Sequence, residues 1–211
     1  ITEEQARLPV FQERIKWFLV DNESNKRIEL RLNKQTFKSA RTGLDGHSHF
    51  NIKLDSIDQM GQWIDIPVVV PEGDKRQFSA KSQLIPRKGL SVISDIDDTI
   101  KTSDVLDKKK LVQNTFLKEY TATDGMPAFY QWLSNEGAYF HYLSSSPWQM
   151  HPMLEPFLDN YYPKGAVHLR NFNPSNRSFF KFFMSSEVYK ITKALNIIDR
   201  YPEHQFLLLG D

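Results

Sequence analysis

Residues 92–99 read Val92-Ile93-Ser94-Asp95-Ile96-Asp97-Asp98-Thr99, an apolar run that passes directly into three carboxylates. In an extended chain Asp95 and Asp97 project to the same side, whereas Ile96 points to the other. Two neighbouring carboxylates repel each other, so one of them has to be protonated, hydrogen-bonded or neutralised by a cation. Hard oxygen ligands with no His or Cys nearby favour Mg²⁺ as that cation. The alternative is an acidic turn whose Asp side chains hydrogen-bond to the local backbone.

The surrounding region, residues 89–211, alternates short apolar runs with longer stretches of helical periodicity. Strands are expected at residues 90–93, 139–143, 167–169 and 206–209, and helices at 108–120, 128–136, 148–158 and 187–200. Strands that alternate with helices form βαβ units and a parallel sheet. The fold class predicted for this region is therefore α/β.

Residues 1–88 show a different pattern. Thr2-Glu3-Glu4-Gln5 has the spacing of a capping box, which predicts a short helix near the N-terminus. Apolar residues then alternate with polar ones in 28–32, 50–54 and 64–70, with turn residues between these runs. Short alternating strands of this kind predict a small β-sandwich over roughly residues 15–86. A linker is expected at residues 86–89, so the predicted domains are 1–88 and 89–211.

Composition excludes several classes of protein. The 211 residues carry 27 Lys and Arg against 26 Asp and Glu, and this net charge of +1 provides no global field for binding nucleic acid. The chain has no cysteine, which excludes disulfides and thiolate chemistry. No apolar run approaches the roughly 20 residues of a membrane-spanning helix. Because the chain begins with Ile1 rather than Met, we expect a processed or cut N-terminus.

Polar residues follow the predicted strands where chemistry is expected. Ser144-Ser145-Ser146-Pro147 follows the second strand, Gly210-Asp211 follows the last, and Lys190 lies on the helix before it. Open parallel sheets bind ligands at the carboxyl ends of their strands, and a Ser hydroxyl with helix-start amides can hold a phosphate. Taken singly, such a Ser is more often a helix cap and such a Lys is more often solvated. The order carboxylate pair, Ser, Lys and Gly-Asp favours a functional site.

In this order the residues resemble the four motifs of the haloacid dehalogenase (HAD) superfamily of phosphatases. Residues 93–100, 142–148, 168–170 and 206–211 resemble more narrowly the actin-patch-associated phosphatidate phosphatases. The resemblance implies a HAD-like Rossmannoid parallel sheet with helices on both faces, preceded by a small N-terminal β-sandwich. That family continues past its Gly-Asp motif, so the catalytic domain is expected to be truncated after Asp211.

The resemblance also implies a mechanism: Mg²⁺-dependent hydrolysis of phosphatidic acid to diacylglycerol and phosphate through an aspartyl-phosphate. Asp95 would be the nucleophile and Asp97 the general acid and base, with a pKa that the Asp95 charge is expected to raise. The implied substrate-binding residues are Ser144, Ser145 and Lys190. The implied Mg²⁺ ligands are Asp95, the backbone carbonyl of Asp97, and Asp211. For Asp98 an Asx-turn or helix cap is expected rather than a catalytic role.

The expected partner is phosphatidic acid or a related anionic phospholipid at a membrane surface, with a protein partner for the N-terminal β domain suggested only by elimination. The expected location is cytoplasmic with peripheral membrane association, or secreted or periplasmic if a signal peptide has been removed. The aromatic cluster Phe179–Met184 is interpreted equally as an interfacial or a buried segment. Two alternatives stay open: a HAD phosphatase for another phospholipid or a phosphoprotein, and a non-catalytic module that binds anionic lipid or protein.

Overall fold

The computed structural model describes residues 1–20, 22–53, 60–171 and 186–210. The chain forms two compact units, one of residues 21–86 and the other of residues 1–20 together with 87–211. The sequence analysis assigned residues 1–20 to the N-terminal domain, whereas the structure joins them to the larger unit. The physical reason is aromatic packing, because Phe11 and Phe18 both contact the ring of Phe116 edge to face.

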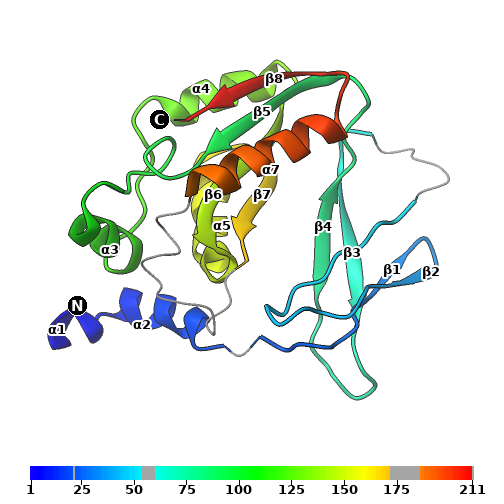
Figure 1. The fold of residues 1–211 in the computed structure, drawn as a ribbon, viewed down its shortest axis with the longest axis horizontal. Coiled ribbons are helices and arrows are strands. Elements are labelled where there is room, and N and C mark those ends of the chain that lie inside the picture. Colours follow the sequence, from blue (N-terminus) through cyan, green and yellow to red (C-terminus); the bar gives the residue numbers. More distant parts are fainter. Residues whose placement is uncertain (21, 54–59, 172–185, 211) are drawn as a thin grey trace. The chain divides into compact units, whose positions relative to one another are not determined.

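The smaller unit is built on an antiparallel sheet. Its strands are β1 (Glu29–Leu32), β2 (Gln35–Lys38), β3 (Trp63–Val69) and β4 (Ser79–Gln83), in the order β2-β1-β3-β4 (Figure 1). Asn33 and Lys34 join β1 to β2 with positive φ angles of 48° and 65°, as a tight hairpin turn of primed type requires. The described residues of this unit form one sheet rather than the two of the expected sandwich.

The larger unit contains a parallel sheet. Its strands are β5 (Gly89–Asp95), β6 (Tyr139–Pro147), β7 (Gly165–Arg170) and β8 (His204–Leu209), in the order β7-β6-β5-β8 (Figure 1). All three strand pairings are parallel. Its helices are α1 (Glu3–Ala6), α2 (Pro9–Ile15), η1 (Lys16–Phe18), α3 (Lys108–Phe116), α4 (Met126–Asn135), η2 (Trp148–Met150), α5 (His151–Tyr161) and α7 (Ser186–Arg200). The predicted α/β class with a parallel sheet is confirmed.

The core of the larger unit lies on both faces of β5. Val92 and Phe140 belong to a buried cluster with the α4 residue Tyr130 and other side chains of α4 and α5. Ile93, the next residue along β5, belongs to a second cluster with Ile197 of α7. Successive strand residues point to opposite faces, so the helices α4 and α5 and the helix α7 cover different faces of the sheet. Figure 1 shows α7 crossing β6.

Strand β6 is longer than its apolar run predicts. We expected the strand to end at Leu143 and Ser144–Pro147 to form a turn, but these residues continue the strand. The pairing register between β6 and β7 shifts over this stretch, with Pro147 opposite Arg170. The small side chains of Ser144 and Ser146 are buried there, at 0% and 4% exposure, because each hydroxyl has a hydrogen-bonding partner within the protein.

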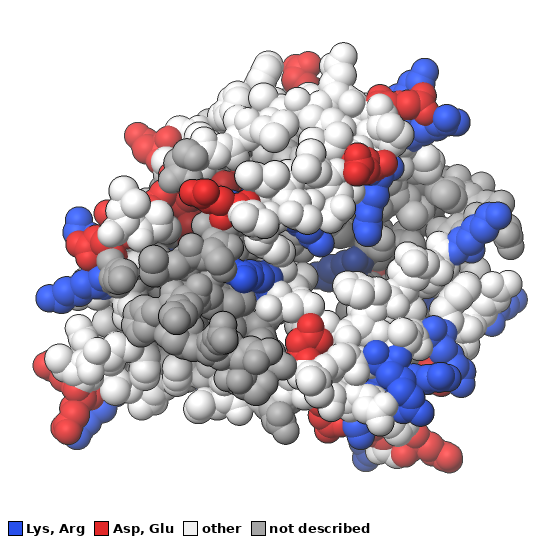
Figure 2. Space-filling model, in the orientation of Figure 1, with Lys and Arg blue, Asp and Glu red and all other residues white. Residues whose placement is uncertain are grey.

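Charges of both signs are interspersed on the face drawn in Figure 2, where Lys and Arg side chains lie beside Asp and Glu side chains along much of the outline. This distribution agrees with the net charge of +1. Among the described residues, no helix combines the length and the apolar character needed to cross a bilayer.

Candidate active site

The site is centred on Asp95, the last residue of β5, which is 8% exposed. The Nζ atom of Lys190 lies 2.6 Å from its Oδ1 atom, although this lysine belongs to α7, far along the chain. Gly210, just after β8, also lies close, since a Cβ atom at that position would be 3.7 Å from the Asp95 Cβ. The last residue of β5 and the first residue after β8 therefore meet a lysine of α7 at the carboxyl edge of the sheet, where open α/β folds bind ligands.

Both carboxylate oxygens of Asp97 form ion-pair or hydrogen-bond contacts. Oδ1 lies 2.8 Å from the Nζ of Lys101 and accepts a hydrogen bond of 2.8 Å from the Ser103 hydroxyl. Oδ2 accepts hydrogen bonds from Ser144 Oγ at 2.8 Å and from Ser146 Oγ at 3.4 Å. The hydroxyl of Ser144 thus lies at the site as predicted, but in this structure it donates to Asp97.

The electrostatics of Asp97 differ from the expectation. Burial by itself would raise the pKa of this carboxyl, but the charge of Lys101 and hydrogen bonds from Lys101, Ser103 and Ser144 outweigh burial and lower the pKa to about 2. The expected increase through Asp95 was therefore wrong for this state of the protein. Asp97 is ionised at neutral pH and is ready to accept a proton.

Asp98 shapes the loop beside the site. Its backbone has a φ of 61°, and its carboxylate accepts hydrogen bonds of 2.7 Å from the backbone N–H groups of Ser103, Asp104 and Val105. Three N–H donors on one carboxylate order a loop that has few hydrogen bonds of its own. This structural role for Asp98 agrees with the expectation from the sequence. The three N–H groups belong to residues five to seven positions after Asp98.

Other predicted site residues lie on β6 or outside the described residues. Ser145 is on β6 and is 7% exposed. Asp211 and the cluster Phe179–Met184 lie outside the described residues. Within the described ranges, no group of three His, Asp or Glu side chains is placed to hold a metal ion.

Sequence reasoning missed Lys101, Ser103 and Ser146. Lys101 is 1% exposed, and its Nζ donates to the hydroxyl of Ser103 as well as pairing with Asp97. A signal was present in the sequence, because a lysine four residues after an acidic motif and next to the apolar Ile100 has little reason to be solvated. Its partner could be recognised only from the folded loop.

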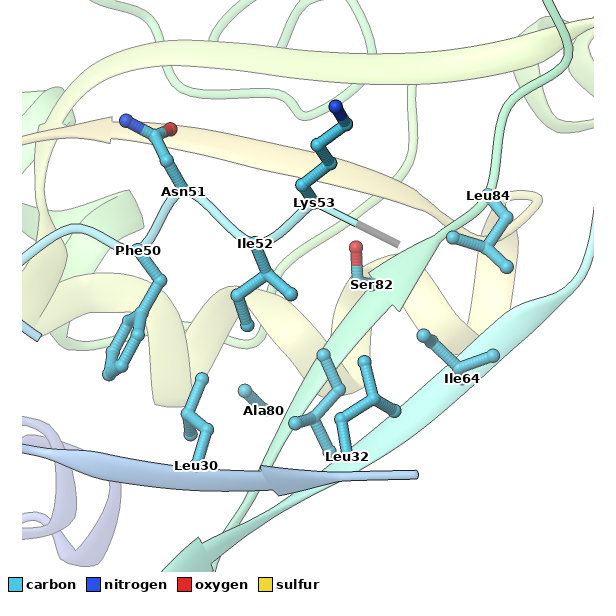
Figure 3. Close-up of a pocket in the computed structure, with 11 residues that line it drawn as sticks. Leu30, Leu32, Phe50, Asn51, Ile52, Lys53, Ile64, Ala80, Ser82 and Leu84 are labelled. Atoms are coloured by element: carbon cyan, nitrogen blue, oxygen red, sulfur yellow. The ribbon is translucent and has the colours of Figure 1, made fainter. Parts of the chain in front are cut away.

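A second concave feature belongs to the smaller unit. A cavity of about 690 Å³ is lined mainly by apolar side chains of the sheet and of residues 50–53. Figure 3 shows Phe50 and Ile52 pointing toward Leu30, whereas Asn51 and Lys53 point away. Among the described residues that line it, Lys53 is the one titratable side chain.

Fold and site together define an α/β protein whose parallel sheet presents an aspartate–lysine pair and a second, clamped aspartate at its carboxyl edge. The family model described as the catalytic domain of phosphatidate phosphatase APP1 matches residues 90–211. That range is more than half of the chain, and it contains Asp95, Asp97, Ser144 and Lys190. The chain therefore belongs to the family of the phosphatidate phosphatase APP1 catalytic domain.

Two fungal proteins are similar to this chain. Phosphatidate phosphatase APP1 of Saccharomyces cerevisiae is 30% identical over 174 residues, which cover 79% of this chain and 29% of the relative. Uncharacterized protein C29B5.04c of Schizosaccharomyces pombe is 28% identical over 141 residues, which cover 64% of this chain and 23% of the relative. This chain thus spans less than a third of the length of either relative.

Proposed function

We propose that this chain carries a Mg²⁺-dependent phosphatidate phosphatase of the HAD type, which hydrolyses phosphatidic acid to diacylglycerol and phosphate. The observation that supports it most is the 2.6 Å approach of Lys190 Nζ to Asp95 Oδ1, because it joins a carboxylate nucleophile to a cation at the ligand-binding edge of the sheet. Family membership supports the same reaction.

Asp95 has the chemistry of a nucleophile for phosphoryl groups. A carboxylate oxygen attacks phosphorus, the bond from phosphorus to the ester oxygen breaks, and an aspartyl-phosphate forms. Lys190 is held against this carboxylate and carries the positive charge that a non-bridging phosphate oxygen needs. Water then attacks the phosphorus of the intermediate, which releases phosphate and restores Asp95.

Asp97 is the proposed proton carrier for both steps. It would donate a proton to the leaving glycerol oxygen and later remove one from the attacking water. Its low pKa in this structure keeps the carboxyl ionised at neutral pH, which is the form that can accept a proton from water. For the first task Asp97 has to take up a proton, and the negative charge of a bound phosphate favours this by raising the pKa of the neighbouring carboxyl.

The residues present fit Mg²⁺. Asp95 is a buried carboxylate at a strand end, and the surrounding donors are oxygen atoms of Asp and Ser rather than sulfur or imidazole, which suits a hard cation. The proposed ligands are the Asp95 carboxylate, the backbone carbonyl of Asp97, and Asp211. When bound, the ion supplies positive charge that reduces the repulsion between the anionic nucleophile and the anionic phosphate.

The proposal further specifies a lipid substrate and peripheral association with a membrane in the cytoplasm. The lipid substrate is supported by the name of the Saccharomyces cerevisiae relative and of the matching family. A phosphatase for another phospholipid or a phosphoprotein would use the same residues. A module that binds anionic lipid without hydrolysing it would keep Lys190 but would not need Asp97.

The test is phosphate release from phosphatidate in detergent micelles and from p-nitrophenyl phosphate, each with Mg²⁺ and with EDTA. The variants are Asp95→Asn, which removes the nucleophile, and Asp159→Asn, a matched change at an exposed aspartate of α5. We expect Mg²⁺-dependent release from phosphatidate that Asp95→Asn abolishes and Asp159→Asn leaves unchanged.

Other outcomes separate the alternatives. Release from the aryl ester alone would keep the reaction and refute the lipid substrate. Binding to phosphatidate vesicles without release from either ester would refute the enzyme and favour a binding module. Release that persists in EDTA would refute the role of Mg²⁺.

A further inference from the structure

Lys101 is a buried cation that the reaction as described above does not use. It is 1% exposed and lies in a short bridge, where its backbone is paired with Asp97 and with Ala122. A buried ammonium group is unfavourable unless a counter-charge and hydrogen-bond acceptors surround it. Here the counter-charge is Asp97, 2.8 Å away, and the hydroxyl of Ser103 is an additional acceptor.

Lys101 completes a clamp on the Asp97 carboxylate. On one side Lys101 and Ser103 contact Oδ1, and on the other Ser144 and Ser146 donate to Oδ2. The first pair comes from the loop after β5 and the second from β6. Because both oxygens are held from opposite sides, the carboxylate has one orientation rather than a range of rotamers.

Lys101 is itself held in place by an aromatic ring. Its Nζ lies 4.9 Å from the ring centroid of Tyr120, and the guanidinium carbon of Arg14 lies 4.2 Å from the same centroid. Arg14 comes from α2 and donates from Nη1 to the carbonyls of Thr115 and Lys118. The ring is 8% exposed, so both cations lie against a buried aromatic ring that restrains each of them.

We propose that Lys101 is a positioning residue for Asp97, which it aims at the oxygen of the leaving alcohol. It acts through Asp97 and does not contact the substrate. The inference rests on the proposed function, since it requires Asp97 to be the proton carrier. It goes further by assigning a role to a residue outside the carboxylate pair, Ser, Lys and Gly-Asp motifs.

The positioning role of Lys101 can be tested by comparing substrates that differ in the basicity of the leaving group. An alkoxide is strongly basic and leaves only if it is protonated, whereas p-nitrophenolate is weakly basic and leaves without a proton. Misplacing the carboxyl of Asp97 therefore slows the first step, formation of the aspartyl-phosphate, far more for an alkyl phosphate than for an aryl phosphate. The second step is common to both esters, so the comparison uses kcat/KM, which reports the steps up to departure of the alcohol. A purely structural defect would lower kcat/KM alike for both esters.

The test compares Lys101→Met and Lys101→Arg with the unchanged chain, using dioctanoyl phosphatidate and p-nitrophenyl phosphate in the same detergent. For Lys101→Met we expect kcat/KM to fall about 10²- to 10⁴-fold with phosphatidate and less than about 10-fold with the aryl ester. Lys101→Arg should recover part of the loss. Lys110→Met is the matched control, because Lys110 is an exposed lysine of α3, and it should change neither rate.

A double variant keeps the test valid if Lys101→Met alone does not fold, because Asp97→Asn with Lys101→Met removes both buried charges together. In the Asp97→Asn background, Lys101→Met should change either rate less than about 2-fold, since the residue it positions is gone. Additive losses would overturn the positioning role. Equal losses for both esters in Lys101→Met, or no loss, would overturn it as well.

The rates of the Asp97→Asn variant distinguish a failure of the proposed function from a failure of the inference about Lys101. If Asp97→Asn lowers kcat/KM equally for both esters, Asp97 is not the proton donor to the leaving group, and the proposed function is wrong on that point. Selective slowing of phosphatidate hydrolysis in Asp97→Asn, without the same selectivity in Lys101→Met, would refute the inference about Lys101 alone.

Discussion

Lowering the pH from 7.5 to 5.5 should destabilise the larger unit through two histidines, of which His141 is buried and His168 is partly buried. His141 of β6 and His168 of β7 face each other, with His141 Nδ1 lying 3.3 Å from His168 Nε2. Burial is the main cause that lowers the pKa of His141 to about 4, with a further contribution from His204. Burial likewise lowers the pKa of His168 to about 3, with contributions from His141, Lys193 and Arg200. A proton on His141 would have little solvent to stabilise it, and a proton on His168 would face the positive charges of Lys193 and Arg200.

The magnitude follows from the difference in proton binding between the two states. In the unfolded chain these histidines have pKa values near 6.5, so at pH 5.5 about ten in eleven molecules carry a proton on each ring. In the folded chain both rings stay neutral at that pH. The free energy of unfolding therefore falls by about 1.4 kcal/mol per histidine, or about 3 kcal/mol for the pair. The loss begins as the pH falls through 6.5 and stops near the folded pKa values.

The assay is urea unfolding at several pH values, followed by tryptophan fluorescence. The chain has four tryptophans, of which Trp63 is the one in the smaller unit, so a Trp63→Phe background makes the signal specific to the larger unit. The His141→Gln and His168→Gln double variant should lose most of the pH dependence between 7.5 and 5.5. If the double variant still loses about 3 kcal/mol over that range, the assignment to these two rings is wrong.

Three further predictions concern the larger unit, each measured as a change in the free energy of urea unfolding in the same background. Gly165→Ala should destabilise by about 2–3 kcal/mol, because its Cβ would lie 2.7 Å from both the Cβ and the carbonyl oxygen of Phe140; a change below about 0.5 kcal/mol would contradict that close approach. Arg14→Met should destabilise by about 3 kcal/mol, since two backbone carbonyls lose their charged donor, and equal stability would show that residues 1–20 do not support this unit. Ser94→Ala should destabilise by about 1–3 kcal/mol because it leaves the buried hydroxyl of Tyr130 without the partner now at 2.6 Å, and adding Tyr130→Phe should recover part of the loss rather than add to it.

Local patterns were sufficient for much of the fold. The apolar runs in residues 90–93, 139–143, 167–169 and 206–209 predicted four strands, and each of them is observed. The helical periodicity of residues 187–200 placed α7 to within a residue of its observed start. From the strands, the rule that parallel strands bring their carboxyl ends to one edge predicted that Asp95 and Gly210 lie close together, as observed. Lys190 lies on a helix, and it was assigned to the site through the order of the motifs and the family resemblance.

Long-range contacts decided what local patterns could not. Residues 1–20 precede the smaller unit along the chain, yet Arg14 hydrogen-bonds to the carbonyl of Thr115, 101 residues later. In the smaller unit, alternating apolar and polar residues indicated strands but did not show which strands pair. The sequence therefore did not predict that the described strands form one sheet.

The amino-acid sequence by itself determined the α/β class, the order of the strands and helices along the chain, and the place of Asp95 and Gly210 at the sheet edge. These follow from hydrophobic periodicity and from residue type, which are properties of neighbouring positions. The state of Asp97 was decided only by the tertiary structure, because Lys101 and Ser144 both reach its carboxylate and outweigh the effect of burial on its pKa. A pKa depends on every charge and hydrogen bond around a group, and those neighbours are assembled only when the loop after β5 folds against β6.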